Sequence, residues 1–171
     1  GKLVLVGASH TSRLSALLPA SLETKFLKLP GQSQTRNGVE EILAAVKDAN
    51  FKKGDFLYMD LLSNIAYMGT DEAGLQVPPV KDGNRKWHVT GSLVACPKPR
   101  MKKVLAQFEP IRGMLGEARL VCGLPLPRYV EEKCCTEGVH IENFRDADYA
   151  EVFSQVREAA KSCLEAAFPG C

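Results

Sequence analysis

The stretch that decides the fold is residues 3–12, LVLVGASHTS, near the start of the chain. Its first residues, Leu3–Val6, form an apolar run typical of a buried strand, and Gly7 then allows a tight turn. Ser9 follows, just before a short helical pattern over Arg13–Leu18. A strand, a glycine turn and a helix in this order favour an α/β protein. They also place a serine hydroxyl beside the N–H groups of a helix N-terminus, where the helix dipole is positive.

Apolar runs and helical patterns alternate along the rest of the chain. We expect strands at Leu3–Val6, Lys25–Leu29, Asp55–Leu62 and Ala118–Leu124, and helices at Val39–Val46, Met101–Leu115 and Tyr149–Ala167. Pro110 should kink or split the second of these three helices. The alternation predicts a three-layer α/β/α fold, with a flavodoxin-like parallel sheet and helices on both faces. In the Gly- and Pro-rich region 69–94, Val77–Val80 and Trp87–Thr90 are expected to flank a turn as a small hairpin or a long loop.

Length and composition bound the class of protein. The chain of 171 residues is long enough for one domain, which we expect to span residues 1–171. Its content of 45% hydrophobic and 25% charged residues is ordinary for a globular protein. No apolar run approaches the roughly 20 residues of a membrane span, and no signal-peptide pattern is present. Because the chain begins at Gly1 rather than Met, we expect a piece of a longer protein.

The cysteines and the basic residues give two further expectations. Six cysteines without a C-x-x-C pair indicate free thiols in a reducing cytoplasm, with no disulfide between Cys134 and Cys135. We expect neither a metal site nor a cofactor, because a closed zinc site needs four ligands. The stretch from Lys81 to Lys103 is rich in basic residues and contains a single acid, Asp82. This stretch is either a solvated loop and helix end, or a patch for lipid or nucleic-acid phosphates.

Polar or small residues follow the predicted strands where an open α/β sheet places its active site. Ser9 follows the first strand, Gly31 the second and Asn64 the third, and Glu137-x-x-His140 precedes the last helix. A serine nucleophile needs a base, and a loop carrying His140 would return to this edge of the sheet. Glu137 could then orient the imidazole. Taken singly, these residues also fit a helix cap, plain turns and a surface pair.

The other two histidines are weaker candidates for the base. His10 adjoins Ser9, and adjacent residues at a helix start point in different directions. His88 is most simply a structural residue of the irregular region.

Together, and in this order, these residues resemble the pattern of the SGNH (GDSL-type) hydrolases. The resemblance implies that Ser9 is the nucleophile, His140 the base and Glu137 its orienting acid. It also implies an oxyanion hole made by the Ser9 N–H, the Gly31 N–H and the Asn64 side-chain amide. The implied activity is that of a serine esterase, which hydrolyses a carboxylic ester through an acyl-enzyme, with no cofactor.

Two departures from the family pattern stand out. Gly7-Ala8-Ser9 replaces the usual Gly-Asp-Ser, and Glu137 replaces the usual Asp. The longer acid puts the third member of the triad in doubt, so the enzyme could work as a Ser–His dyad.

A narrower resemblance rests on residues 83–93, on Pro125-Leu126-Pro127-Arg128-Tyr129 and on Cys134-Cys135. These segments look like the esterase domain of first-open-reading-frame proteins of some LINE-type retrotransposons. Such domains are joined to coiled-coil or nucleic-acid-binding segments, so nucleic acid is a possible partner through flanking domains, and an anionic membrane surface is another. The implied substrates are short-chain acyl, acetyl or lipid esters. Two alternatives remain: an inactive module that binds lipid or nucleic acid, and a phosphate-binding domain that uses Gly7–Ser12 as an anion cradle.

Overall fold

The computed structural model describes residues 1–29, 36–81, 87–126, 139–141 and 146–171. The strands are β1 (Leu3–Gly7), β2 (Thr24–Lys28), β3 (Phe56–Met59), β4 (Tyr67–Thr70), β5 (Gln76–Val77), β6 (Val80–Lys81), β7 (Trp87–Val89), β8 (Val94–Ala95), β9 (Arg119–Cys122) and β10 (Val139–Ile141). The helices are α1 (Ser9–Ala16), α2 (Arg36–Asp48), α3 (Lys98–Ala106), the 3-10 helix η1 (Glu109–Met114) and α4 (Asp146–Ala167).

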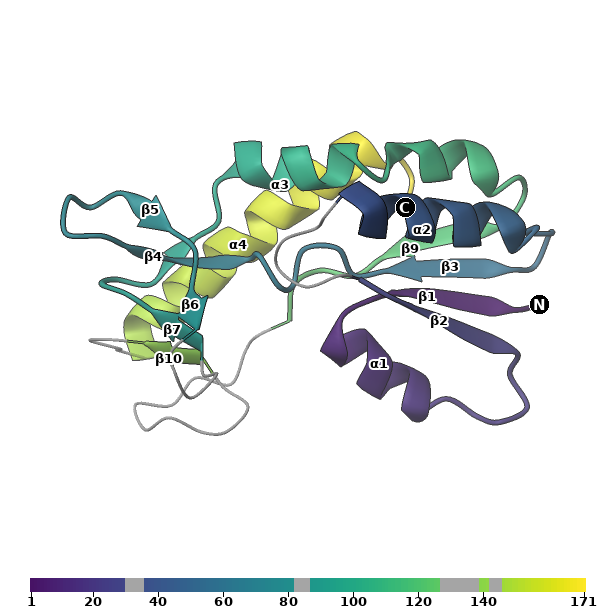
Figure 1. Ribbon diagram of the computed structural model, residues 1–171, viewed down its shortest axis with the longest axis horizontal. Helices are drawn as coiled ribbons and strands as arrows, with labels where there is room; N and C mark the ends of the chain where they lie inside the picture. Colours follow the sequence, from purple (N-terminus) through teal and green to yellow (C-terminus); the bar gives the residue numbers. More distant parts are fainter. Residues whose placement is uncertain (30–35, 82–86, 127–138, 142–145) are drawn as a thin grey trace.

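A parallel sheet in the order β2-β1-β3-β9 forms the centre of the molecule. Its strands run toward the side on which β6, β7 and β10 lie (Figure 1). Each of the four predicted strands is present, so the prediction of an α/β protein with a parallel sheet is confirmed. The third strand is shorter than predicted: it ends at Met59 rather than Leu62, because Asp60 begins a turn there.

The main core lies on one face of this sheet. The alternate residues Val4 and Val6 of β1 and Leu57 and Met59 of β3 point into it, and all four are at most 1% exposed. Apolar side chains of α2, α3, η1 and α4 cover them, and Figure 1 shows these helices on the same side of the sheet. Pro110 does split the predicted helix, because α3 ends at Ala106 and η1 begins at Glu109.

The opposite face of the sheet is covered less completely. Helix α1 packs there against β1 and β2. Phe56 of β3 and Val121 of β9 are 39% and 44% exposed, so the described residues leave these two strands partly open. A shallow hollow of about 530 Å³ lies on this face of the sheet, lined by leucines of β1, of α1 and of the segment that follows α1, and by side chains of β3 and β9 that include Phe56, Tyr58 and Val121.

Short strands form a second region beyond the carboxyl ends of the parallel sheet. In one small sheet β6 pairs with β7 antiparallel, with Val80 opposite His88, and β10 joins β7 in parallel. The expected hairpin is therefore present, although Val77 belongs to β5 and pairs with β4. The strands β4 and β8 pair with each other and were not predicted, because stretches of two to four residues among glycines carry little periodic signal.

Candidate active site

Ser9 is the first residue of α1 and its side chain is exposed. The turn before it is tight: a Cβ on Gly7 would collide with the side chain of Thr11, so only glycine fits there. Ala8 occupies the N-cap position and offers no side-chain cap, and the first turn of α1 holds no acidic residue. The positive end of the helix dipole is therefore not neutralised from within the helix, and it lies beside an accessible hydroxyl.

A second turn follows the neighbouring strand β3. The Asp60 carboxylate accepts a hydrogen bond from the Ser63 N–H at 3.1 Å and another from the Ser63 hydroxyl at 2.7 Å. Both side chains are buried, at 4% and 5% exposure. The Asp60 N–H donates to the Val6 carbonyl of β1 at 2.9 Å, which ties this turn to the end of the strand that leads to Ser9. Asn64 comes directly after this rigid turn and is half-buried.

The same carboxylate affects a neighbouring tyrosine. Burial, and to a smaller extent the negative charge of Asp60, raise the pKa of the Tyr58 hydroxyl. Tyr58 therefore stays neutral at physiological pH and can act only as a hydrogen-bonding or packing group.

His140 lies in the short strand β10, and not in a loop as predicted. The correction has a simple cause: Val139 and Ile141 are β-branched and favour an extended backbone on either side of the histidine. The register of β10 on β7 sets His140 opposite His88. The structure thus places His88 in a strand, where the sequence suggested a loop residue, and brings two histidines to one position of the ladder. For His140 the structure describes the backbone alone.

The structure thus gives the positions of some of the predicted site residues. Ser9 and Asn64 follow adjacent parallel strands whose ends are joined by the hydrogen bond between Asp60 and Val6. Gly31 and Glu137 lie outside the described residues. Asp60 was not among the predicted residues. An Asp directly after a strand with Ser three residues later is the pattern of a side-chain-closed turn, and that signal could have identified it.

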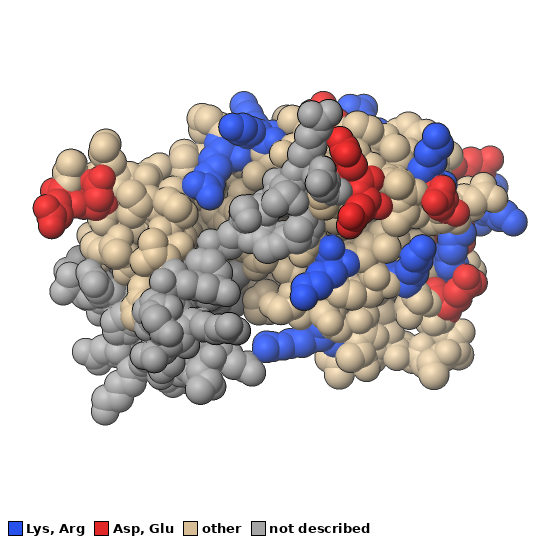
Figure 2. Space-filling view, in the orientation of Figure 1, with Lys and Arg blue, Asp and Glu red and all other residues tan. Residues whose placement is uncertain are grey.

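Helix α3 contains the C-terminal part of the basic stretch 81–103, which the sequence analysis considered as a patch for phosphates. Lys98, Lys102 and Lys103 are exposed and Arg100 is half-buried, while Met101 packs into the core. Figure 2 shows Lys and Arg side chains gathered over this helix. In the part of the chain that the structure describes, no helix has the length and apolarity needed to cross a membrane. Within the same ranges, no cluster of three or more His, Cys, Asp or Glu side chains could hold a metal ion.

Comparisons with known proteins give no family assignment: no family model, no curated protein and no solved structure matches this chain. The function proposed below therefore rests on the residues and on their geometry.

Proposed function

We propose that this chain is a serine esterase that hydrolyses carboxylic esters through an acyl-enzyme. The observation that carries the proposal is the exposed Ser9 at the uncapped N-terminus of α1, directly after a central parallel strand. A nucleophile in this position can use nearby N–H donors to stabilise the negative charge that develops on the ester oxygen.

The reaction would proceed in two stages. The Ser9 hydroxyl attacks the ester carbonyl carbon while a base takes its proton, and a tetrahedral intermediate with an anionic oxygen forms. The Ser9 N–H, the Gly31 N–H and the Asn64 amide donate to that oxygen. When the intermediate collapses, the C–O bond to the alcohol breaks, and the protonated base returns the proton to the leaving alcohol. Water then attacks the acyl-serine by the same route and regenerates the hydroxyl.

His140 is the proposed base, with Glu137 as its orienting acid. Its strand lies on the side of the molecule toward which the parallel strands run, and that is the side a base for Ser9 requires (Figure 1). The strand order β2-β1-β3-β9 equals the first four positions of the flavodoxin-like order 2-1-3-4-5. This agreement supports, as part of the proposal, the three-layer arrangement of the SGNH hydrolases.

We further propose that the substrate is a short-chain, acetyl or lipid ester and that α3 can meet an anionic surface. Three exposed lysines on a helix without an acidic residue suit anionic headgroups, where each cation near the surface contributes about 1 kcal/mol. Replacing Lys98, Lys102 and Lys103 by Gln should abolish salt-sensitive cosedimentation with phosphatidylserine vesicles. Equal recovery of both proteins in the supernatant at low salt would refute this contact and leave the esterase proposal intact.

The experiment that tests the proposed activity uses a short-chain nitrophenyl ester. Wild type and Ser12→Ala should hydrolyse it at similar rates, since Ser12 is exposed on the same helix and serves as the matched control. Ser9→Ala should lose about 10³-fold or more in kcat. Equal rates for wild type and Ser9→Ala would favour the alternative, an inactive module that binds lipid or nucleic acid.

A further inference from the structure

Strand β2 forms one edge of the central parallel sheet. The strand order is β2-β1-β3-β9, and no other strand of the described ranges pairs with the outer side of β2. Figure 1 shows β2 as the outermost strand on its side of this sheet. An edge strand presents a row of backbone N–H and C=O groups that have no ladder partner. The outer side of β2 therefore offers hydrogen-bonding groups to the backbone of another extended chain.

Hydrogen bonds at the two ends of β2 identify which of its backbone groups point outward. The Leu3 N–H donates to the Glu23 carbonyl at 2.9 Å, and the Leu29 N–H donates to the Gly7 carbonyl at 2.8 Å. Because the direction of the backbone groups alternates along a strand, the odd-numbered residues of this stretch face β1. The residues whose N–H and C=O groups point to the free edge are Thr24, Phe26 and Lys28.

A groove of about 560 Å³ lies beside this edge, between β2 and α2. Residues 26–29 form one of its walls. The other wall is one face of α2, where the lining residues follow the helical spacing of three and four: they are Gly38, Glu41, Ile42 and Ala45. Since glycine and alanine project little or nothing from a helix, Gly38 and Ala45 leave space between the helix and the strand. The groove thus runs along the free hydrogen-bonding groups of β2.

The charges along this edge indicate what kind of chain fits it. Lys25 and Lys28 are exposed, and neither forms an ion pair with an acid of the described ranges. Lysines at a sheet edge oppose pairing with another basic strand, including the same edge of a second copy of this chain. They favour a strand that carries carboxylates. Glu41 lies in the opposite wall and disfavours a carboxylate on the side of α2.

We propose that the groove between β2 and α2 binds an extended peptide segment of another protein, in which acidic and apolar residues alternate. The segment adds a strand to the free edge of β2. Its apolar side chains lie on the side of α2, against the half-buried Leu27 and Ala45. Its carboxylates lie on the other face of the sheet, to which the alternation of side chains assigns Lys28. The inference does not depend on the esterase proposal, because none of these residues has a role in that reaction.

The test measures binding of synthetic peptides to the folded 171-residue chain by fluorescence anisotropy. The probe is a fluorescein-labelled heptapeptide of alternating Glu and Val, and we expect it to bind saturably. A heptapeptide of alternating Lys and Val should bind at least about tenfold more weakly. Two further acidic peptides are methylated on the backbone nitrogens of either all Glu or all Val residues. Because only one of these two sets of N–H groups faces β2 in an added strand, one methylated peptide should bind normally and the other should not bind.

Two pairs of variants test the two walls of the groove. Lys28→Glu should weaken binding of the acidic peptide by about tenfold or more and strengthen binding of the basic one. Its control, Lys161→Glu, makes the same change of charge at an exposed position of α4 and should affect neither. Ala45→Phe fills the groove and should abolish binding of the acidic peptide. Ala44→Phe is its control, because Ala44 is exposed on the same helix and does not line the groove.

Amide hydrogen exchange measured by NMR locates the bound peptide. The N–H groups of Thr24, Phe26 and Lys28 should exchange more slowly in the complex, while that of Leu120 in β9, the other end of the strand order, should not change.

Several outcomes would overturn the proposal. They are absence of binding, equal binding of the two methylated peptides, wild-type affinity in Ala45→Phe, and protection at Leu120 in place of β2. A dimer of the wild-type chain that Ala45→Phe abolishes would also overturn it, because a second copy would then occupy the groove. Circular dichroism shows whether each variant is folded, and the methylated peptides and Lys28→Glu decide the question if Ala45→Phe is not.

Discussion

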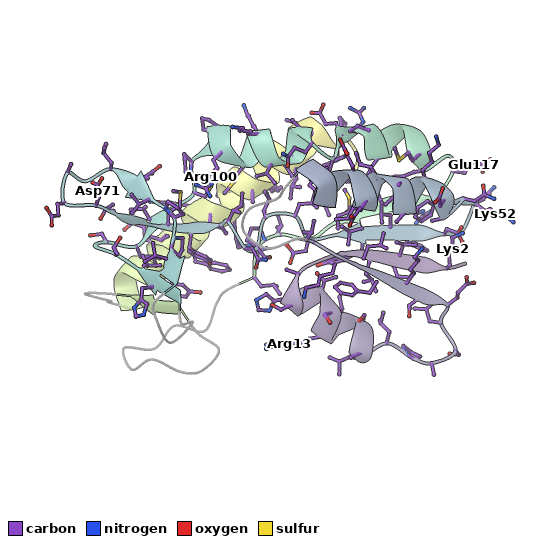
Figure 3. The ribbon with its side chains drawn as sticks, in the orientation of Figure 1. Lys2, Arg13, Lys52, Asp71, Arg100 and Glu117 are labelled. Carbon is purple, nitrogen blue, oxygen red and sulfur yellow. The ribbon has the colours of Figure 1, made fainter. Side chains whose placement is uncertain are left out.

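Two buried aspartates at opposite ends of β3 are used in different ways. At the amino end, Asp55 accepts hydrogen bonds from the Lys2 N–H at 2.9 Å and the Lys52 N–H at 2.8 Å, and it lies 3.6 Å from the Lys2 ammonium group. Figure 3 shows Lys2 and Lys52 together at this end of the sheet. At the carboxyl end, the carboxylate of Asp60 accepts its two hydrogen bonds from Ser63, and among the described residues no cation forms an ion pair with it.

We interpret this difference as a division between an end of the sheet that contributes stability and an end that can carry the proposed site. Asp55 connects segments that are distant in sequence, and a cation neutralises its charge. Both interactions stabilise this end of the sheet. Asp60 shapes a local turn that presents the polar Asn64, next to an uncapped helix with an exposed serine. Substitutions at the carboxyl end should therefore change the reaction, and those at the amino end should change stability alone.

The largest effect is expected from the proposed base. His140→Ala should lower kcat by about 10²–10⁴-fold, as is usual for the loss of a general base, with little change in stability. Glu137→Ala should cost less if a Ser–His dyad carries the reaction, while equal losses would indicate a full triad. Hydrolysis rates of the purified variants measure both effects. If His140→Ala kept full activity, the base would have to be sought elsewhere, first at His88, which lies opposite it in the ladder.

The next effect concerns the proposed oxyanion donor. Asn64→Ala should lower kcat by about 10²–10³-fold with KM nearly unchanged, because the donated hydrogen bond strengthens only in the transition state. Steady-state kinetics separate the two parameters. A change confined to KM would mean that Asn64 binds the substrate and does not stabilise the developing charge.

A smaller effect is expected from Asp60→Asn, which tests whether the buried turn positions Asn64. The amide keeps one carbonyl oxygen and cannot accept both hydrogen bonds from Ser63, so unfolding should become easier by about 1–2 kcal/mol. Displacement of the turn should also lower kcat, by up to about 10²-fold. Denaturant titration and kinetics on the same preparation measure both. Loss of stability at an unaltered kcat would show that the turn is structural only.

Asp55→Asn is the counterpart at the amino end and should leave kcat unchanged. Hydrogen bonds from the Lys2 and Lys52 N–H groups are the main reason that the pKa of Asp55 is lowered. A lowered pKa in the folded state stabilises the protein above the unfolded pKa near 4, and this contribution is lost as the pH falls through the folded value. Between about pH 5 and pH 2, the urea midpoint of wild type should therefore fall more than that of the variant. Parallel pH dependences would contradict this role.

The parts of the fold with a periodic signal could be predicted from the sequence. Long apolar runs identified the four parallel strands, and Pro110 identified the break between α3 and η1. Among the short strands, the hairpin of β6 and β7 was one of two expected arrangements. The strands β4, β8 and β10 could not be predicted in this way, because each is short and depends on pairing with a strand elsewhere in the chain. The end of β3 was missed for a related reason: Leu61 and Leu62 continue the apolar run, while the side chain of Asp60 closes a turn and ends the strand.

The same distinction applies to the candidate site. Ser9 could be predicted because strand, glycine and helix are all local features, and the structure places it at the start of α1. The buried partnership of Asp60 with Ser63 and the alignment of His88 with His140 depend on tertiary packing and on strand register. Neither leaves more than a short, common pattern in the sequence.

Covalent labelling with a fluorophosphonate tests the central claim most directly, because the reagent reacts with an activated serine and leaves a mass tag on it. The folded chain should be labelled at Ser9 alone, the Ser12→Ala control should be labelled equally, and Ser9→Ala should not be labelled. Labelling at another serine, or no labelling of folded wild type under conditions in which a known serine esterase reacts fully, would contradict the assignment of Ser9 as the nucleophile.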